Sequence, residues 1–216
     1  TPMHSFHFLL LQKRMKKILE WFSGIFSPLF VPSYGMGMVL LVSTLHFLPE
    51  NVRWTSLIIT FVITCVLPVA AILGMYKAGY VKDPQLNNRA ERTAPYVVTL
   101  LCYLGAALFF YRASAPLWLP LFLAGGAGAC LVNIVVNRWW KISAHAAAVG
   151  GVVALAFRLV ASHYAIVNMN VWLSAVIIVA GLVMSARVYL QRHTLWQVLA
   201  GFANGFAWVW FLTMIR

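Results

Sequence analysis

Acidic residues are scarce in this sequence. Asp and Glu number four, against sixteen Lys and Arg, which gives a formal net charge of +12. The four acids are scattered along the chain, an arrangement that argues against a phosphatase site built around two metal ions. We therefore expect no metal and no other cofactor. The acids are Glu20, Glu50, Asp83 and Glu91.

Cysteine is also rare and follows no pattern. Cys65, Cys102 and Cys130 all fall inside apolar stretches, and their number is odd. Their spacing does not match that of metal ligands or of a disulfide framework. We interpret them as buried packing residues.

Charge as a whole is low, because 9% of the residues are charged and 62% are hydrophobic. A soluble domain of this length carries roughly a quarter charged residues. The mean hydropathy of +0.85 reflects long apolar runs, each long enough to cross a bilayer at about 20 residues per span. A soluble helical protein would need polar faces at helical spacing, and these runs lack them. The sequence therefore predicts an integral membrane protein.

Seven apolar runs are predicted to span the membrane. The expected fold class is all-α, a polytopic integral membrane helical bundle with about six or seven transmembrane helices. A count of six transmembrane helices stays open because the third and fourth runs are short or rich in glycine. The runs are 24–48, 54–76, 95–111, 116–136, 144–162, 170–188 and 195–214.

Residues 1–23 precede these runs as a basic, interfacial segment. Lys13, Arg14, Lys16 and Lys17 lie among Leu and Ile there, which fits either an amphipathic helix at the membrane surface or a positively charged cytoplasmic leader. The segment lacks a short apolar stretch followed by a small-residue cleavage site, so we expect no cleavable signal peptide.

The remaining basic residues sit mostly in short gaps between the apolar runs. This placement suits anionic lipid headgroups or a phosphorylated substrate at the membrane edge, and it argues against nucleic acid as a partner. The three gaps richest in polar residues are 77–93, 137–145 and 187–197. Two spans separate each gap from the next, so all three are predicted to lie on one side of the membrane.

The third gap contains Arg187, His193 and Gln197. Arg187 and His193 are six residues apart, so they can meet only if the helix ends between them. His193 and Gln197 are four apart and share a face once the next helix begins. Gln197 is then placed to fix the tautomer of the imidazole, which a nucleophilic histidine requires.

The other two gaps supply further candidates. Ser143 stands where a helix N-cap would stand, so its hydroxyl and the free amides of the first turn are predicted to bind an anion. His145 lies in that turn, where it is suited to protonating a leaving alkoxide. The first gap supplies cations that match phosphate oxygens: Lys82, Arg89 and Arg92. Three more basic residues have a second interpretation, as charges that fix topology: Arg138, Lys141 and Arg192.

These spacings resemble the type 2 phosphatidic acid phosphatase superfamily across residues 82–197. That family has the motifs Lys-x6-Arg-Pro, Pro-Ser-Gly-His and Ser-Arg-x5-His-x3-Asp. The matching residues are Lys82-x6-Arg89, Ser143-x-His145 and Arg187-x5-His193. Arg92 lies outside the motifs and is proposed from its chemistry alone.

The resemblance implies that residues 24–216 form a transmembrane domain like that of a lipid phosphatase. It implies that His193 attacks phosphorus and becomes phosphohistidine, and that His145 protonates the leaving group. It further implies a set of residues that bind the phosphate oxygens: Lys82, Arg89, Ser143 and Arg187.

The sequence also departs from the family pattern. Ala90 replaces a proline, Ile142 and Ala144 replace the proline and glycine around the motif serine, and Ala186 replaces a serine. Gln197 stands where the family has aspartate, and a neutral amide cannot stabilise an imidazolium as a carboxylate does.

Two functions are therefore expected as alternatives. The first is a metal-independent phosphatase acting on a lipid phosphate or pyrophosphate in the bilayer. The second is an inactive protein on the same scaffold that binds or transports lipid phosphates, which Gln197 favours. We expect a bacterial cytoplasmic membrane, with the motifs on the cytoplasmic face by the positive-inside tendency, although members of the family often work on the outer face. Anionic lipids are expected partners, and a homo-oligomer stays open.

Overall fold

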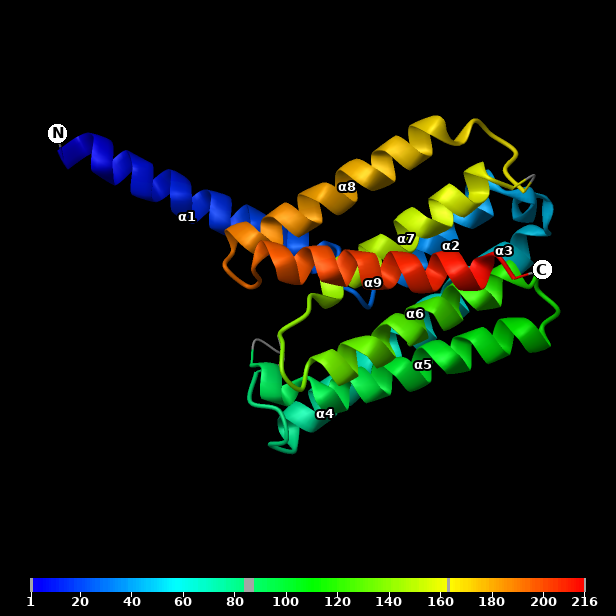
Figure 1. The fold of residues 1–216 in the computed structure, drawn as a ribbon, viewed down its shortest axis with the longest axis horizontal. Helices are drawn as coiled ribbons and strands as arrows, with labels where there is room; N and C mark the ends of the chain where they lie inside the picture. The colour runs from blue at the N-terminus through cyan, green and yellow to red at the C-terminus, as the bar shows by residue number, and fades with distance from the viewer. Residues whose placement is uncertain (1, 84–87, 163, 216) are drawn as a thin grey trace.

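The computed structural model describes residues 2–83, 88–162 and 164–215. Its helices form an elongated bundle, from one end of which the N-terminal helix projects (Figure 1). The α-helices are α1 (Pro2–Ile25), α2 (Val31–Val42), α3 (Glu50–Phe61), α4 (Leu67–Lys77), α5 (Thr93–Arg112), α6 (Trp118–Val136), α7 (Ala144–Val160), α8 (Met169–Tyr189) and α9 (Leu195–Thr213). Three short elements complete them: the 3-10 turns Thr44–Phe47 and Arg89–Glu91, and the π-helical turn Val62–Val66 that joins α3 to α4.

The predicted fold class is confirmed: the protein is a polytopic membrane helical bundle. Within the described residues, five helical stretches are long and apolar enough to cross a bilayer. One of them is the continuous stretch Glu50–Lys77, which contains α3 and α4. The others are α5 with the 3-10 turn before it, α6, α8 and α9. The helix α2 and the helix α7 are apolar but shorter.

The first predicted span, 24–48, differs from the structure. The helix α2 covers only 12 residues of it, about 18 Å at 1.5 Å per residue, which is less than the roughly 30 Å of a bilayer core. Pro32 lies in the first turn of α2 and starts the helix. At the other end Ser43 is extended, and it pairs as an isolated bridge with Ala165.

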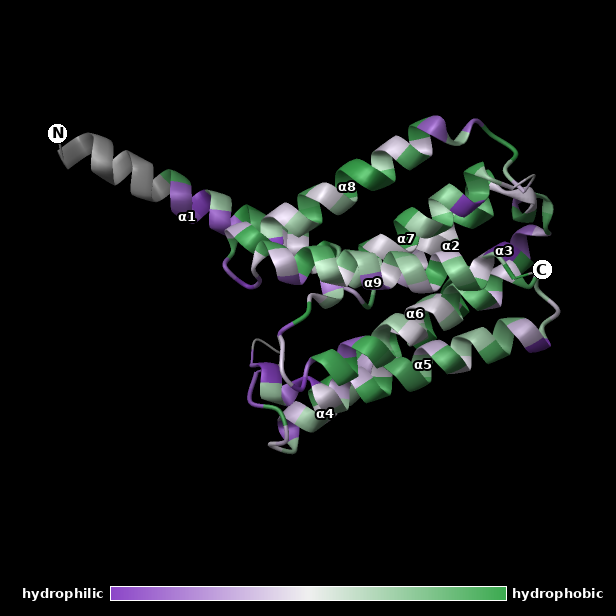
Figure 2. Ribbon diagram, viewed as in Figure 1, coloured by the Kyte–Doolittle hydropathy of each residue, from purple (hydrophilic) through white to green (hydrophobic). Residues whose placement is uncertain are grey.

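With α3 and α4 taken as one continuous stretch, the helices from α2 to α9 alternate in direction along the bundle (Figure 1). As a result, the connections α4–α5, α6–α7 and α8–α9 all lie at the end from which α1 projects. Figure 2 shows hydrophilic residues concentrated at the helix ends and in the connections, with apolar residues along the helices. The predicted placement of the three polar gaps on one side of the bundle is therefore confirmed.

Glycines allow α7 and α9 to pack closely. A Cβ atom on Gly201 would meet the Ser143 carbonyl, and one on Gly205 would overlap the Ala147 backbone. Gly150 of α7 likewise faces the Phe202 backbone. Small residues therefore let the backbones of these two helices approach closely. Most residues of α7 are buried by its neighbours.

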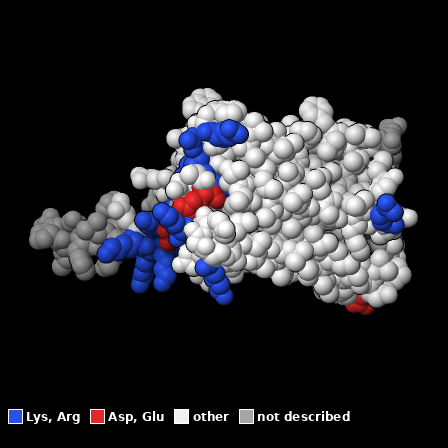
Figure 3. All heavy atoms as spheres, turned by 90° about the horizontal axis from the view of Figure 1, so that it is seen from below, with Lys and Arg blue, Asp and Glu red and all other residues white. Residues whose placement is uncertain are grey.

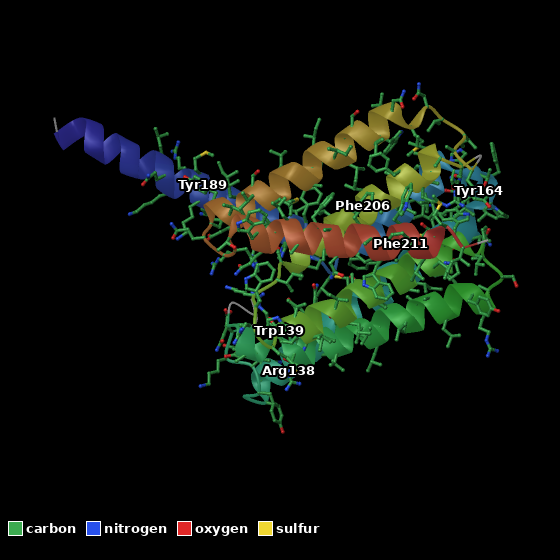
Figure 4. All side chains as sticks on the ribbon, in the orientation of Figure 1. Arg138, Trp139, Tyr164, Tyr189, Phe206 and Phe211 are labelled. Atoms are coloured by element: carbon green, nitrogen blue, oxygen red, sulfur yellow. The ribbon has the colours of Figure 1, made fainter. Side chains whose placement is uncertain are left out.

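Aromatic side chains mark both ends of the bundle. Trp139 lies in the α6–α7 connection at the polar end and is 65% exposed, whereas Tyr164 lies at the opposite end (Figure 4). Between the ends, Phe206 of α9 stacks on Phe202 and Trp210. Trp139 therefore has the position that is typical of an aromatic residue at a membrane interface.

The helix α1 joins the bundle near its C-terminal end. It contacts α8, and the Tyr34 hydroxyl donates a hydrogen bond of 2.9 Å to the Ile25 carbonyl. Figure 3 shows the Lys and Arg side chains gathered mainly at this end of the molecule. Whether residues 1–23 lie on a membrane surface stays a prediction.

Candidate active site

A cavity of about 600 Å³ connects the polar end of the bundle with its interior. Its polar part is lined by side chains from α1, α5, α7 and α8 and from the α8–α9 connection. Its deeper part is lined mainly by apolar and small side chains of α2, α5, α6, α7 and α9. The charged and histidine side chains that line it are Glu20, Arg92, His145, Arg187, Arg192 and His193.

His193 lies in the α8–α9 connection and is buried, with 7% of its surface exposed. The helix α8 ends at Tyr189, and Gln191 follows with a positive φ of 53°, so the chain turns sharply before His193. This turn lets Arg187 and His193 line the same cavity. The helix end that the six-residue spacing requires is therefore present.

Two acceptors fix the tautomer of His193. Its Nδ1 lies 3.1 Å from the Lys141 carbonyl oxygen and 3.2 Å from Gln197 Oε1. Gln197 Oε1 also accepts from the Thr194 amide at 3.1 Å, as part of the capping box that begins α9. Because a carbonyl can only accept, Nδ1 carries the proton and the lone pair of the neutral ring is on Nε2. That nitrogen is the one suited to nucleophilic attack.

The surroundings of His193 hold the ring in its neutral form. Burial lowers the pKa of His193 from 6.5 to about 3, and the nearby positive charges of Arg92 and Arg187 act in the same direction. The hydrogen bond to the Lys141 carbonyl opposes this shift. A neutral imidazole at neutral pH has the lone pair that a nucleophile needs.

The lowered pKa of His193 predicts a loss of stability in acid. The unfolded chain takes up this proton near pH 6.5, whereas the folded protein resists it down to about pH 3. The free energy of unfolding should therefore fall as the pH drops between these values, by at most about 1.4 kcal/mol per pH unit for this one group. Thermal unfolding in detergent at pH 7, 5.5 and 4.5 measures this pH dependence of stability.

The matched variants for this measurement are His193→Asn and His46→Asn. His193→Asn removes the titrating ring, so its stability should depend less steeply on pH than that of the wild type. His46 is exposed at the other end of the bundle, so His46→Asn is the control for replacing a histidine outside the cavity. Equal slopes for the wild type and His193→Asn would show that His193 is not held neutral by the fold.

His145 lies in the first turn of α7 and lines the cavity with His193. Its Nε2 is 3.2 Å from the Ser23 carbonyl oxygen, an acceptor that requires a proton on this nitrogen. The N-terminus of α7 also points its free amides and its partial positive charge toward this end of the bundle. Because this acceptor holds Nε2, the proton that His145 can give to a leaving group is one on Nδ1.

Arg187 is a partly buried cation that lines the cavity with the two histidines. Its Nη1 donates to Ser23 Oγ at 2.8 Å, and its buried Nε has no hydrogen-bond partner. Burial, followed by the charges of Arg92, Arg187 and Arg192, lowers the pKa of Lys141, which shows that these basic groups interact. Such a cluster, with few acids beside it, attracts phosphate.

Two of the predicted phosphate ligands do not reach the cavity. Lys82 and Arg89 are exposed and are absent from its lining. Glu91 Oε2 accepts from the amides of Lys82 and Asp83 at 2.8 and 3.3 Å. The carbonyl of Arg89 accepts from Asn137 Nδ2 at 2.9 Å, which anchors the turn with the Arg89 side chain outside.

Arg92 occupies the inner side of this turn instead. It is 6% exposed and lines the cavity. Arg89 begins the 3-10 turn and Arg92 follows its end, so the two side chains have different surroundings. Residues 84–87 of the same gap lie outside the described residues.

Ser143 is fully buried and does not line the cavity. Its Oγ accepts from the Ala146 amide at 3.3 Å, so the predicted N-cap of α7 is present. Its backbone amide donates to the Gln197 carbonyl at 3.2 Å, which joins the α6–α7 connection to α9. The anion-binding hydroxyl expected at this position is therefore directed into the protein.

Other lining residues were not predicted from the sequence as part of the site. Glu20 and Ser23 belong to α1, more than 100 residues before His145 in the chain, and no motif includes them. Tyr96 follows Arg92 by four residues on the same helical face, and both line the cavity. This spacing could have predicted Tyr96 as a lining residue. Arg192, interpreted as a candidate topology charge, lies 3.9 Å from Glu20 and lines the cavity.

No group of three or more His, Cys, Asp and Glu side chains within the described residues is arranged to hold a metal ion. Comparison with curated proteins and with solved structures gives no match. A family model, however, matches residues 137–216, which include His145, Arg187, His193 and Gln197. Members of this family are phosphatases, so the match supports a hydrolase of phosphoric esters. The resemblance seen in the motifs is confirmed for residues 137–216, which match the PAP2 superfamily.

Proposed function

We propose that the protein is a lipid phosphatase that cleaves a lipid phosphate or pyrophosphate through a phosphohistidine intermediate. The observation that carries the proposal is the cavity, which joins a cluster of cations and two histidines to an apolar interior. A phosphate headgroup suits the first part, and a hydrocarbon chain suits the second. A small soluble ester would leave the apolar part empty.

The polar side chains in the deep part of the cavity support a hydrocarbon ligand. Thr99 Oγ1 donates to the Pro95 carbonyl at 2.9 Å, and the Tyr103 hydroxyl donates to the Pro28 carbonyl at 2.9 Å. Because these donors are already used within the protein, the cavity wall presents mainly carbon to a ligand. Burial of methylene groups there stabilises binding by about 0.8 kcal/mol for each group.

In the proposed reaction, Nε2 of His193 attacks the phosphorus atom. A nitrogen–phosphorus bond forms and the bond from phosphorus to the leaving oxygen breaks. His145, protonated on both ring nitrogens in the substrate complex, gives that oxygen the proton on Nδ1 and becomes neutral. Water then attacks the phosphohistidine with His145 as general base, which restores both histidines and releases phosphate. Arg187 and Arg92 stabilise the charge on the phosphoryl oxygens in both steps.

A panel of substrates tests this function. Purified protein in detergent with a chelator is expected to release inorganic phosphate from long-chain lipid phosphates. A water-soluble aryl phosphate should give a kcat/KM lower by about two orders of magnitude, because it lacks the chain that binds in the apolar part. No release from any lipid phosphate or pyrophosphate would contradict the proposal.

A glycine that faces the cavity provides a matched variant for this panel. Gly126 lines the cavity, and a Cβ atom there would lie 2.8 Å from the Tyr103 ring. Gly126→Leu should therefore raise KM for the long-chain substrate about tenfold and leave turnover of the aryl phosphate unchanged. Gly105 faces outward, with nothing within 4 Å of a Cβ atom, so Gly105→Leu is the control and should change neither value.

Gln197 favours the second candidate function, a lipid-phosphate binder or transporter without catalysis. Its Oε1 orients His193 but carries no charge to stabilise an imidazolium. Tight binding of lipid phosphate to purified protein, with no release of phosphate, would support this alternative.

The protein is an integral membrane protein, and we propose that it resides in a bacterial cytoplasmic membrane with anionic lipids around its basic end.

A further inference from the structure

The last turns of α1 reach into the phosphate end of the cavity. Glu20 and Ser23 both line it, and Ser23 is 3% exposed. The helix α1 lies outside the three motifs and outside the matched residues 137–216. Its contribution to the site is therefore a feature of this chain that neither the motifs nor the family match indicates.

Ser23 contacts both the candidate proton donor and the candidate phosphate clamp. Its carbonyl oxygen is 3.2 Å from His145 Nε2, and its Oγ accepts a hydrogen bond of 2.8 Å from Arg187 Nη1. One residue thus fixes the position of two side chains from two different helices. Because the Arg187 bond uses the serine oxygen as an acceptor, the hydroxyl hydrogen stays available to donate to a phosphate oxygen.

The charges around Ser23 indicate what it faces. Arg187 is held by a neutral hydroxyl rather than by a carboxylate, and its buried Nε has no partner. A buried donor without a partner costs free energy that an anionic ligand recovers. Ser143, whose hydroxyl the family resemblance assigns to phosphate, caps α7 outside the cavity.

We propose that Ser23 is a phosphate-binding residue that also positions Arg187 and His145, and that it supplies the serine hydroxyl of this site. The identity of the ligand as a phosphate rests on the proposed function. The helix α1 is then a required part of the site, because without its last turns the clamp loses its hydroxyl and the proton donor loses its acceptor.

Equilibrium binding of inorganic phosphate and orthovanadate to purified full-length protein tests this inference without turnover. Ser23→Ala should weaken both affinities about tenfold, as expected for loss of a hydrogen bond to a charged group. Ser23→Thr keeps the hydroxyl and should restore affinity to within twofold. Ser162→Ala is the control, since its Oγ bonds to the Leu159 carbonyl at the other end of the bundle.

The unfolding temperature of each variant separates binding from folding. Ser23→Ala should bind phosphate weakly at a temperature at which it is still folded, whereas Ser143→Ala should lower the unfolding temperature through loss of the helix cap. Wild-type affinity in Ser23→Ala would overturn the inference. If Ser23→Ala does not fold, wild-type affinity in Ser23→Cys would overturn it equally, because a thiol is a weak donor.

These measurements also distinguish this inference from the proposed function. Weak phosphate binding by Ser23→Ala, in a protein that releases phosphate from no lipid, would leave Ser23 as an anion ligand and contradict only the phosphatase. Unchanged binding in a protein that hydrolyses lipid phosphates would contradict only the role of Ser23.

Discussion

Replacing His193 with asparagine is expected to lower kcat on the best lipid phosphate by about four orders of magnitude. The asparagine Nδ2 can take the place of the ring Nδ1 and donate to the Lys141 carbonyl, which His193 approaches at 3.1 Å. The local fold is thus preserved while the nucleophilic Nε2 is lost. The remaining cations still bind phosphate, so KM should change much less than kcat.

Two further measurements assign this loss to chemistry. Rapid acid-free quenching after addition of a radiolabelled substrate should leave label on the wild-type protein and none on His193→Asn. His46→Asn is the control, because His46 is exposed far from the cavity, and it should keep activity within twofold. A His193→Asn variant that retains a tenth of wild-type activity would exclude His193 as nucleophile.

Gly205→Ala is expected to cause the largest loss of stability, about 3 kcal/mol or more. The new Cβ would overlap the carbonyl of Ala147, and it would lie 2.9 Å from the Ala147 Cα. Backbone atoms cannot rotate away as a flexible side chain can, so α9 must move away from α7. Both helices carry residues of the cavity lining, and phosphate binding should weaken with stability.

The control for Gly205→Ala is the same substitution in open surroundings. A Cβ atom on Gly181 of α8 would have nothing within 4 Å, so Gly181→Ala should leave stability unchanged or raise it by up to about 1 kcal/mol through helix propensity. Thermal unfolding in detergent compares the two. Equal unfolding temperatures for wild type and Gly205→Ala would show that the close approach of α7 and α9 is not needed.

Much of the site could be predicted from spacing. His145, Arg187 and His193 line one cavity, and Gln197 contacts the imidazole that it was predicted to orient. These residues lie next to helix ends that the sequence marks clearly, at Ser143 and Thr194. The helical repeat places His145 and Gln197 relative to those ends, whereas the turn between α8 and α9 directs His193.

In the first polar gap, 77–93, motif spacing does not predict which cations line the cavity. Lys82 and Arg89 match the motif, but they are exposed and Arg92 faces the cavity in their place. This segment forms a turn held by Glu91 and Asn137. In such a turn, side chains at neighbouring positions point in different directions. Contacts with residues distant in sequence therefore decide which side chain faces the cavity.

The membrane class, most of the long helices and the single side for the polar gaps were determined by the sequence alone, because apolar length and the number of crossings are properties of a linear chain. The first predicted span, 24–48, is the exception, since α2 covers only Val31–Val42. Only the tertiary structure decided which cations line the cavity, that Ser143 is directed away from it, and that Glu20 and Ser23 enter it from α1. The physical reason is distance along the chain. Ser23 meets His145 and Arg187 across separations of 122 and 164 residues, and packing of whole helices, rather than any local pattern, brings them together.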